Sequence, residues 1–119
     1  MADIRMGPAE TQFAEIIWSN EPIASGLLSK KAEEILNWKK TTSFTVLKRL
    51  CERGIFQNQN GTVTSLISKE EFFARHSEAY VQETFGGSLP AFIAAFSTRK
   101  KLTDKEIDEM KNLIEKMRG

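Results

Sequence analysis

The sequence predicts a mainly α-helical chain with one small β-hairpin: a winged helix-turn-helix domain followed by a helical C-terminal domain. Three helical segments precede two short β-prone runs, and this order is typical of a winged helix-turn-helix. Beyond the hairpin, helix-capping patterns and helical apolar spacings continue to the end of the chain. We therefore predict a winged-helix DNA-binding domain over residues 1–68 and a helical dimerisation domain over residues 69–119.

Three helices are predicted before the hairpin. The first begins at Gly7-Pro8, because proline suits the first helical position. The second begins near Ser25 and ends near Asn37. The third runs from about residue 40 to residue 53, and Gly54 follows as a residue suited to the left-handed conformation of a helix end. Helical spacing predicts a buried side made of Phe13, Ile16, Ile17, Trp18, Leu28, Ala32, Ile35, Leu36, Ser43, Val46, Leu47 and Leu50.

The predicted hairpin consists of residues 55–59 and 62–67, joined by Asn60-Gly61. An Asn-Gly pair between strands is the strongest short-range hairpin signal, because both central residues of a type I′ turn need positive φ. The hairpin would form the wing.

The C-terminal domain is predicted to contain three helices. Ser68–Glu71 reads as a capping box that opens a long helix, Gly86-Gly87 ends it, Ser88 begins a shorter one, and Thr103–Glu106 is a second capping box. Short helices so rich in apolar residues cannot bury their faces alone, so we expect a homodimer. The predicted interface comprises Phe72, Tyr80, Phe85, Leu89, Phe92, Ile93, Phe96, Ile107, Met110, Ile114 and Met117.

Composition argues against several classes of function. The formal net charge is +1, and the chain has one cysteine, Cys51, and one histidine, His76. A lone cysteine forms no internal disulfide, and no apolar run approaches ~18 residues, so we expect a cytoplasmic protein without a membrane span. One histidine provides neither a metal cluster nor a base for a nucleophile. We expect no enzyme activity, no cofactor and no metal.

The third helix carries the one dense basic patch of the sequence. Residues 39–53 include five basic residues and a single acidic one, Glu52. Threonine side chains can reach base edges, whereas lysine and arginine neutralise phosphates. The predicted DNA contacts, two of them in the hairpin, are Lys39, Lys40, Thr41, Thr42, Thr45, Lys48, Arg49, Asn60 and Thr62.

Four sequence patterns, in order, resemble those of the penicillinase-repressor family. The first is Ala9-Glu10 followed by Ile16-Ile17-Trp18. The second comprises Trp38, Thr42, Thr45, Leu47, Arg49, Leu50 and Gly54. The last two are Phe85-Gly86-Gly87-Ser88-Leu89 and Leu102-Thr103 followed by Glu106-Ile107. The likeness runs from Gly7 to about Met117.

The resemblance implies a homodimeric transcription repressor that binds a palindromic operator through helix three and the wing. In the β-lactam branch of the family a sensor-linked protease relieves repression by one cut in the tail. The resemblance places that cut between Ala95 and Phe96, where the family pattern has asparagine in place of Ala95. Members of the copper branch carry cysteine pairs near the C-terminus, which this chain lacks.

The departures from the family pattern concentrate where DNA would be read. Thr41 and Thr62 stand at usually basic positions, Leu66 at a usually aromatic one, and residues 54–68 contain no lysine or arginine. We infer that the chain binds an operator sequence different from that of other family members, and that its wing binds phosphates more weakly. Phe44 replaces a glutamine and would either contact a thymine methyl or cover the core, the second being preferred. The neutral wing and Phe44 also fit an alternative function, a winged-helix protein-interaction module.

Overall fold

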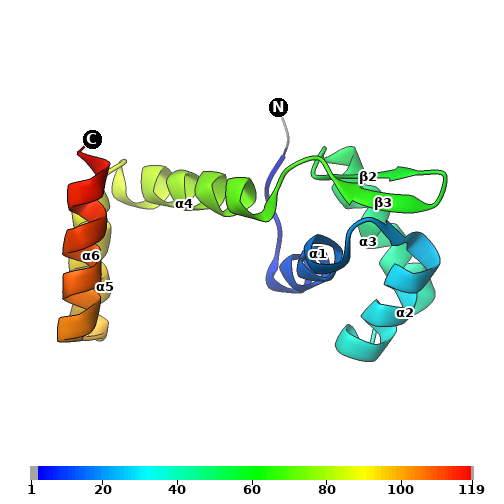
Figure 1. Cartoon of the computed structure of the whole chain (residues 1–119), viewed down its shortest axis with the longest axis horizontal. Coiled ribbons are helices and arrows are strands. Elements are labelled where there is room, and N and C mark those ends of the chain that lie inside the picture. The colour runs from blue at the N-terminus through cyan, green and yellow to red at the C-terminus, as the bar shows by residue number, and fades with distance from the viewer. Residues whose placement is uncertain (1–2, 119) are drawn as a thin grey trace. The chain divides into compact units, whose positions relative to one another are not determined.

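The computed structural model describes residues 3–118, and the chain divides between Ser77 and Glu78 into two compact units. We call the first unit the head and the second the tail. The elements follow in the order α1 (Pro8–Asn20), β1 (Ile23–Ala24), α2 (Ser25–Leu36), α3 (Lys40–Glu52), β2 (Phe56–Gln59), β3 (Thr62–Ser65), α4 (Lys69–Phe85), α5 (Leu89–Arg99) and α6 (Asp104–Met117) (Figure 1).

Helices α2 and α3 end where the sequence predicts. Helix α2 stops at Asn37, whose φ of 59° is left-handed and whose N–H donates to the carbonyl oxygen of Glu33 at 3.0 Å. Helix α3 stops before Gly54, where φ is 80°. A left-handed residue at a helix end lets the last carbonyls find donors, as Leu50 O does from the N–H of Ile55 at 3.1 Å.

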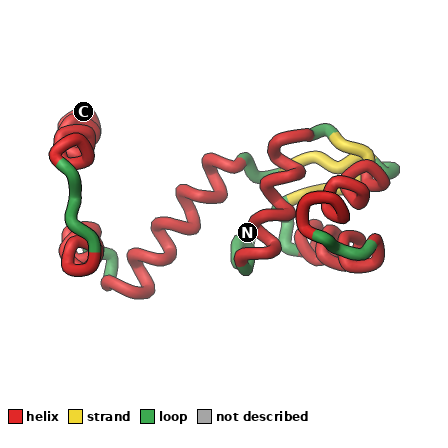
Figure 2. Tube along the Cα trace, turned by 90° about the horizontal axis from the view of Figure 1, so that it is seen from below, coloured by secondary structure: helices red, strands yellow, loops and turns green. Residues whose placement is uncertain are grey.

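The wing belongs to a three-stranded antiparallel sheet with the order β1-β3-β2, drawn in yellow beside the helices in Figure 2. Asn60 and Gly61 have φ values of 53° and 86°, the positive pair that a type I′ turn needs. Strands β2 and β3 pair from Gln59↔Thr62 to Phe56↔Ser65. Strand β1, which the sequence does not predict, pairs Ile23 with Val63.

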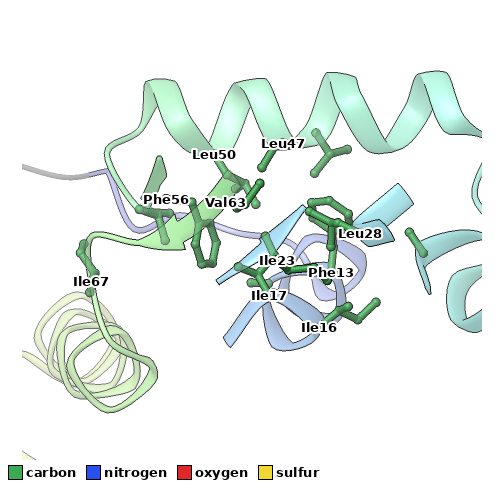
Figure 3. Packing of buried hydrophobic residues seen from close by; sticks show 14 of the residues in the cluster. Phe13, Ile16, Ile17, Ile23, Leu28, Leu47, Leu50, Phe56, Val63 and Ile67 are labelled. Carbon is green, nitrogen blue, oxygen red and sulfur yellow. The ribbon is translucent and has the colours of Figure 1, made fainter. Parts of the chain in front are cut away.

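The core of the head lies between the helices and the sheet (Figure 3). Leu47 and Leu50 project from α3 toward Phe56 and Val63 of the sheet. Most of the predicted buried side is confirmed, with Trp18 and Leu36 half-buried against the core. Ile35 is the exception: it is 63% exposed and borders an open pocket between α1 and α2. The largest fully buried side chains are Phe13, Phe56, Phe72, Ile17, Leu28, Leu50, Ile55 and Val63.

The head extends past residue 68, where the sequence predicted a domain boundary. The ring of Phe72, in the first turn of α4, is 1% exposed and lies 5.4 Å from the ring of Trp18. Trp18 in turn donates its indole N–H to the carbonyl oxygen of Ile67 at 3.1 Å. Phe72 was predicted in the subunit interface, but its ring already belongs to this core and has no surface left for a second chain.

The tail has its own aromatic cluster. The rings of Tyr80, Phe85, Phe92 and Phe96 follow one another at centroid distances of 5.5–6.4 Å. Ser88 caps α5 by accepting from the N–H of Ala91 at 3.1 Å. The described residues contain no helix long and apolar enough to cross a membrane.

Capping differs between the two predicted boxes. At α6 the box is complete, because Thr103 accepts from the N–H of Glu106 and the carboxylate of Glu106 accepts from the N–H of Thr103. At α4 Ser68 accepts from the N–H of Glu71, whereas the Glu71 carboxylate accepts from Arg75 one turn later.

Candidate nucleic-acid interface

Helix α3 presents a polar, basic face opposite its buried side. Ser43, Val46, Leu47 and Leu50 are buried, which fixes the rotation of the helix. The nine residues predicted to contact DNA are all exposed: Lys39, Lys40, Thr41, Thr42, Thr45, Lys48, Arg49, Asn60 and Thr62.

The exposed face has a centre and two flanks. Thr41, Thr45 and Lys48 follow one another at helical spacing along its centre. Thr42 and Arg49 lie seven residues apart on one flank, which is the flank nearest α1 because Arg49 approaches Glu10 of that helix. Lys40 and Phe44 define the other flank. A helix inserted in a groove would therefore direct Thr45 at base edges and its flanking cations at phosphates.

The carboxylate of Glu10 in α1 lies at different distances from two arginines, Arg49 of α3 and Arg53 directly after it. It is 3.3 Å from the guanidinium of Arg53 and 4.0 Å from that of Arg49. Arg53 also donates to the carbonyl oxygen of Arg5, and its side chain is 25% exposed against 46% for Arg49. Arg53 is thus a structural cation that joins the N-terminal segment to α3, whereas Arg49 keeps its guanidinium accessible to a phosphate. The sequence does not reveal this role of Glu10, which depends on the crossing of α1 and α3.

The wing is polar but uncharged. Asn60 and Thr62 are exposed at its turn, and the amide of Gln57 donates to the hydroxyl of Thr64 at 3.1 Å across the strands. With no lysine or arginine from Gly54 to Ser68, the wing has only hydrogen-bonding groups to offer a phosphate backbone.

Phe44 is not part of the core, contrary to the preferred interpretation of the sequence. Its side chain is 37% exposed, and it is absent from the residues of the described chain that pack on the core. It borders an open groove of about 320 Å³ between α3 and β2, lined also by Leu47, Lys48, Cys51 and Asn58. Burial, and secondarily the charge of Glu52, raise the pKa of the Cys51 thiol, so this cysteine stays protonated and unreactive.

The tail leaves large apolar side chains exposed. Five residues of the predicted interface are 43–73% exposed: Tyr80, Leu89, Phe96, Ile114 and Met117. Five others are half-buried within the tail itself: Phe85, Phe92, Ile93, Ile107 and Met110. Leu113, which is not among the predicted interface residues, is 59% exposed beside Ile114. The sequence could have indicated Leu113, because it is an apolar residue three positions after Met110 and therefore lies next to it on the same side of the helix.

Within residues 3–118, no three or more histidine, cysteine, aspartate or glutamate side chains converge on a point where a metal ion would bind.

The fold defines the class: a winged helix-turn-helix protein with a basic third helix. Residues 6–116 match the sequence model of the family described as "Penicillinase repressor", and the chain belongs to this family. It is similar to the methicillin resistance regulatory protein MecI of Staphylococcus aureus, with 20% identity over 112 residues that cover 91% of each chain. The chain is accordingly a transcriptional repressor by family and not an enzyme.

Proposed function

We propose that this chain is a cytoplasmic homodimer that represses transcription by binding a palindromic DNA operator, one head to each half-site. The observation that carries the proposal is the exposed face of α3, where Lys39, Lys40, Lys48 and Arg49 surround Thr41 and Thr45. Cations around short hydrogen-bonding side chains are the arrangement that positions a helix on phosphates while it reads bases.

Dimerisation is supported by the apolar surface of the tail. Phe96 of α5 and Ile114 and Met117 of α6 are 43%, 52% and 73% exposed, a large apolar surface for a monomeric unit of this size. A second copy of the same surface would cover these side chains, since an isologous interface brings identical patches together. Two linked heads would then match the twofold symmetry of a palindrome.

We also propose that cleavage between Ala95 and Phe96 relieves repression. Both residues are exposed in α5, and the bond lies before all of α6, so a cut detaches most of the apolar surface that supports the dimer. Mass spectrometry of the protein from native cells, before and after treatment with a cell-wall antibiotic, tests this step. Intact protein in cells whose target genes have switched on would exclude it.

The exposed Phe44 and the uncharged wing favour an alternative function, a protein-interaction module. The salt dependence of the affinity for DNA distinguishes this alternative from operator binding. Neutralising phosphates releases counterions, so log K falls linearly with log salt at about −0.9 per phosphate. Four cations from each subunit give an expected slope of roughly −7 on a palindromic duplex. Fluorescence anisotropy with labelled duplexes measures it. A slope near zero would exclude a phosphate-binding role for α3.

Lys105→Ala is the matched control for this measurement. Lys105 lies on the side of α6 opposite Ile107 and Ile114 and is exposed, so the variant loses one positive charge outside the proposed interface. Its slope should equal that of the unmodified protein, whereas loss of Lys48, which removes one cation from each of the two subunits, should make the slope less steep by about 2.

A further inference from the structure

The ring of Phe44 is the one large apolar group among the residues that form the exposed face of α3. Lys40, Phe44 and Lys48 follow at four-residue intervals, so they form one line along the helix. The ammonium of Lys40 lies 5.8 Å from the centre of the ring, within the range of a cation–π contact. An aromatic ring thus lies between two cations that the proposed function assigns to phosphates.

The ring has an accessible edge. Phe44 is 37% exposed and borders the groove between α3 and β2, so no residue of the described chain covers it on that side. Exposure of a phenylalanine to water is unfavourable, and a contact in the complex would offset this cost.

The major groove of DNA offers a phenyl ring one suitable partner. The faces of the bases are stacked inside the duplex, and base edges present hydrogen-bond donors and acceptors that a hydrocarbon ring cannot satisfy. The exception is the C5-methyl group of thymine, which projects into the major groove and makes apolar contacts with protein side chains.

We infer that Phe44 is a specificity-determining residue that selects thymine, through its C5-methyl group, at one position of each operator half-site. This inference rests on the proposed function. Lys40 and Lys48 hold the strand on either side of that thymine, and the methyl group packs against the exposed edge of the ring. Burying one methyl group corresponds to about a fourfold change in affinity for each contact.

Replacement of thymine by deoxyuridine tests the inference, because it removes the methyl group and leaves every hydrogen-bonding group in place. Duplexes that the full chain enriches from a random pool are resynthesised with deoxyuridine at each thymine in turn. Affinity is then measured for the unmodified protein and for Phe44→Ala, Phe44→Leu and Ile35→Ala. Ile35 is the matched control, an apolar side chain 63% exposed on α2 rather than α3.

We expect one thymine per half-site whose replacement weakens binding about fourfold in the unmodified protein and in Ile35→Ala. Phe44→Ala should bind both duplexes equally, and Phe44→Leu should keep part of the difference because leucine still offers an apolar contact. Equal circular dichroism and melting temperatures establish that the variants are folded.

Two failures are distinguishable. If the unmodified protein enriches sequences but no deoxyuridine weakens it, or if Phe44→Ala keeps the full difference, the role of Phe44 is overturned and DNA binding stands. If the unmodified protein enriches no sequence at all, the proposed function is overturned and the role of Phe44 with it.

Discussion

The hydroxyl of Thr45 donates its hydrogen to the carbonyl oxygen of Thr41 at 2.9 Å, one turn earlier in α3. A hydroxyl has one donor and two acceptor lone pairs, so this bond leaves Thr45 with acceptor capacity only. In the major groove the exocyclic amino groups of adenine and cytosine are the donors. The side chain at the centre of the exposed face is therefore suited to an adenine or a cytosine.

Thr45→Val should relax that preference. Valine keeps the shape and the methyl group of threonine but removes the acceptor, so discrimination at the contacted base pair should fall by about 1–3 kcal/mol. Selection from random duplexes with each variant measures the change. Thr98→Val is the matched control, because Thr98 makes a similar bond to the carbonyl oxygen of Ala95 on α5. An unchanged base preference in Thr45→Val would exclude base reading by the hydroxyl.

Arg49→Ala should instead weaken binding to all sequences alike. A phosphate contact carries no sequence information, so its loss from both subunits lowers affinity uniformly and makes the salt slope less steep by about 2. The fold should persist, because Arg53 still pairs with Glu10 at 3.3 Å and exposed ion pairs contribute at most about 1 kcal/mol. Anisotropy titrations on the operator and on unrelated duplexes provide the comparison. A loss confined to the operator would contradict the phosphate role.

The elements of the head that the sequence predicts are those with strong local signals. Asn60-Gly61 specifies its turn through two positive φ angles, and Gly54 ends α3 for the same reason. The buried side of α3 follows from helical spacing, which also fixes which side of the helix faces outward. Most of the candidate DNA-contacting residues were therefore accessible to sequence reasoning.

What the sequence did not reveal depends on contacts between distant segments. Strand β1 has only two residues, too few for a periodic pattern, and exists because Ile23 pairs with Val63. Phe72 has the same helical spacing as an interface residue, and only its packing on Trp18 assigns it to the core. Phe44 is likewise indistinguishable from a core phenylalanine until its exposure is known.

The capping box of α6 makes part of the stability of the tail depend on pH. The backbone N–H of Thr103 and then its hydroxyl bond to the carboxylate of Glu106, at 3.0 and 3.1 Å, and lower the pKa of that carboxyl below its ordinary value of 4.5. A lowered folded-state pKa gives a contribution that is complete above the ordinary value and lost as the pH falls through the lowered one.

Glu106→Gln should therefore destabilise the protein at pH 7 and much less at pH 3, because glutamine retains an acceptor oxygen but not the charge. Thermal unfolding by circular dichroism at the two pH values measures the difference. Asp108→Asn, on the same helix but outside the cap, should show no such pH dependence from this source. An equal effect of Glu106→Gln at both pH values would show that the charge of the cap does not matter.

At the scale of the whole molecule, α4 contributes to both units: its first half belongs to the head and its second half to the tail. The two halves pack against different parts of the chain. In the first half, Phe72 is buried beside Trp18. In the second half, Tyr80 and Phe85 pack against Phe92 in the aromatic cluster of the tail. Because the first half of α4 is part of the head, a fragment of the head is expected to fold only if it includes this half of the helix.

Truncation after Ser77 should give a folded, monomeric head, whereas truncation after Ser68 should not give a stable one. The shorter fragment loses the ring of Phe72, and comparable losses of buried phenylalanine cost about 3–5 kcal/mol. Sedimentation and thermal unfolding of both fragments measure association and stability. A fragment ending at Ser77 that still dimerises tightly would place the subunit interface in the head and contradict the proposed role of the tail.

A chain that ends at Ala95 should separate two contributions to operator affinity: the contacts that each head makes with its half-site, and the gain from joining two heads in one dimer. It keeps the head and the ring of Phe92 but loses Phe96 and all of α6, including the exposed Leu113, Ile114 and Met117. Two heads that act as one bivalent ligand gain an effective concentration worth roughly a hundredfold or more, and this gain disappears when the heads bind separately. On a palindromic duplex the shortened chain should therefore bind about a hundredfold more weakly than the full chain.

On a duplex with a single half-site the two should bind equally, because each head makes the same contacts there. Equal affinity on the palindrome would show that the residues after Ala95 do not join the heads, and would remove the physical basis for relief of repression by a cut at this bond.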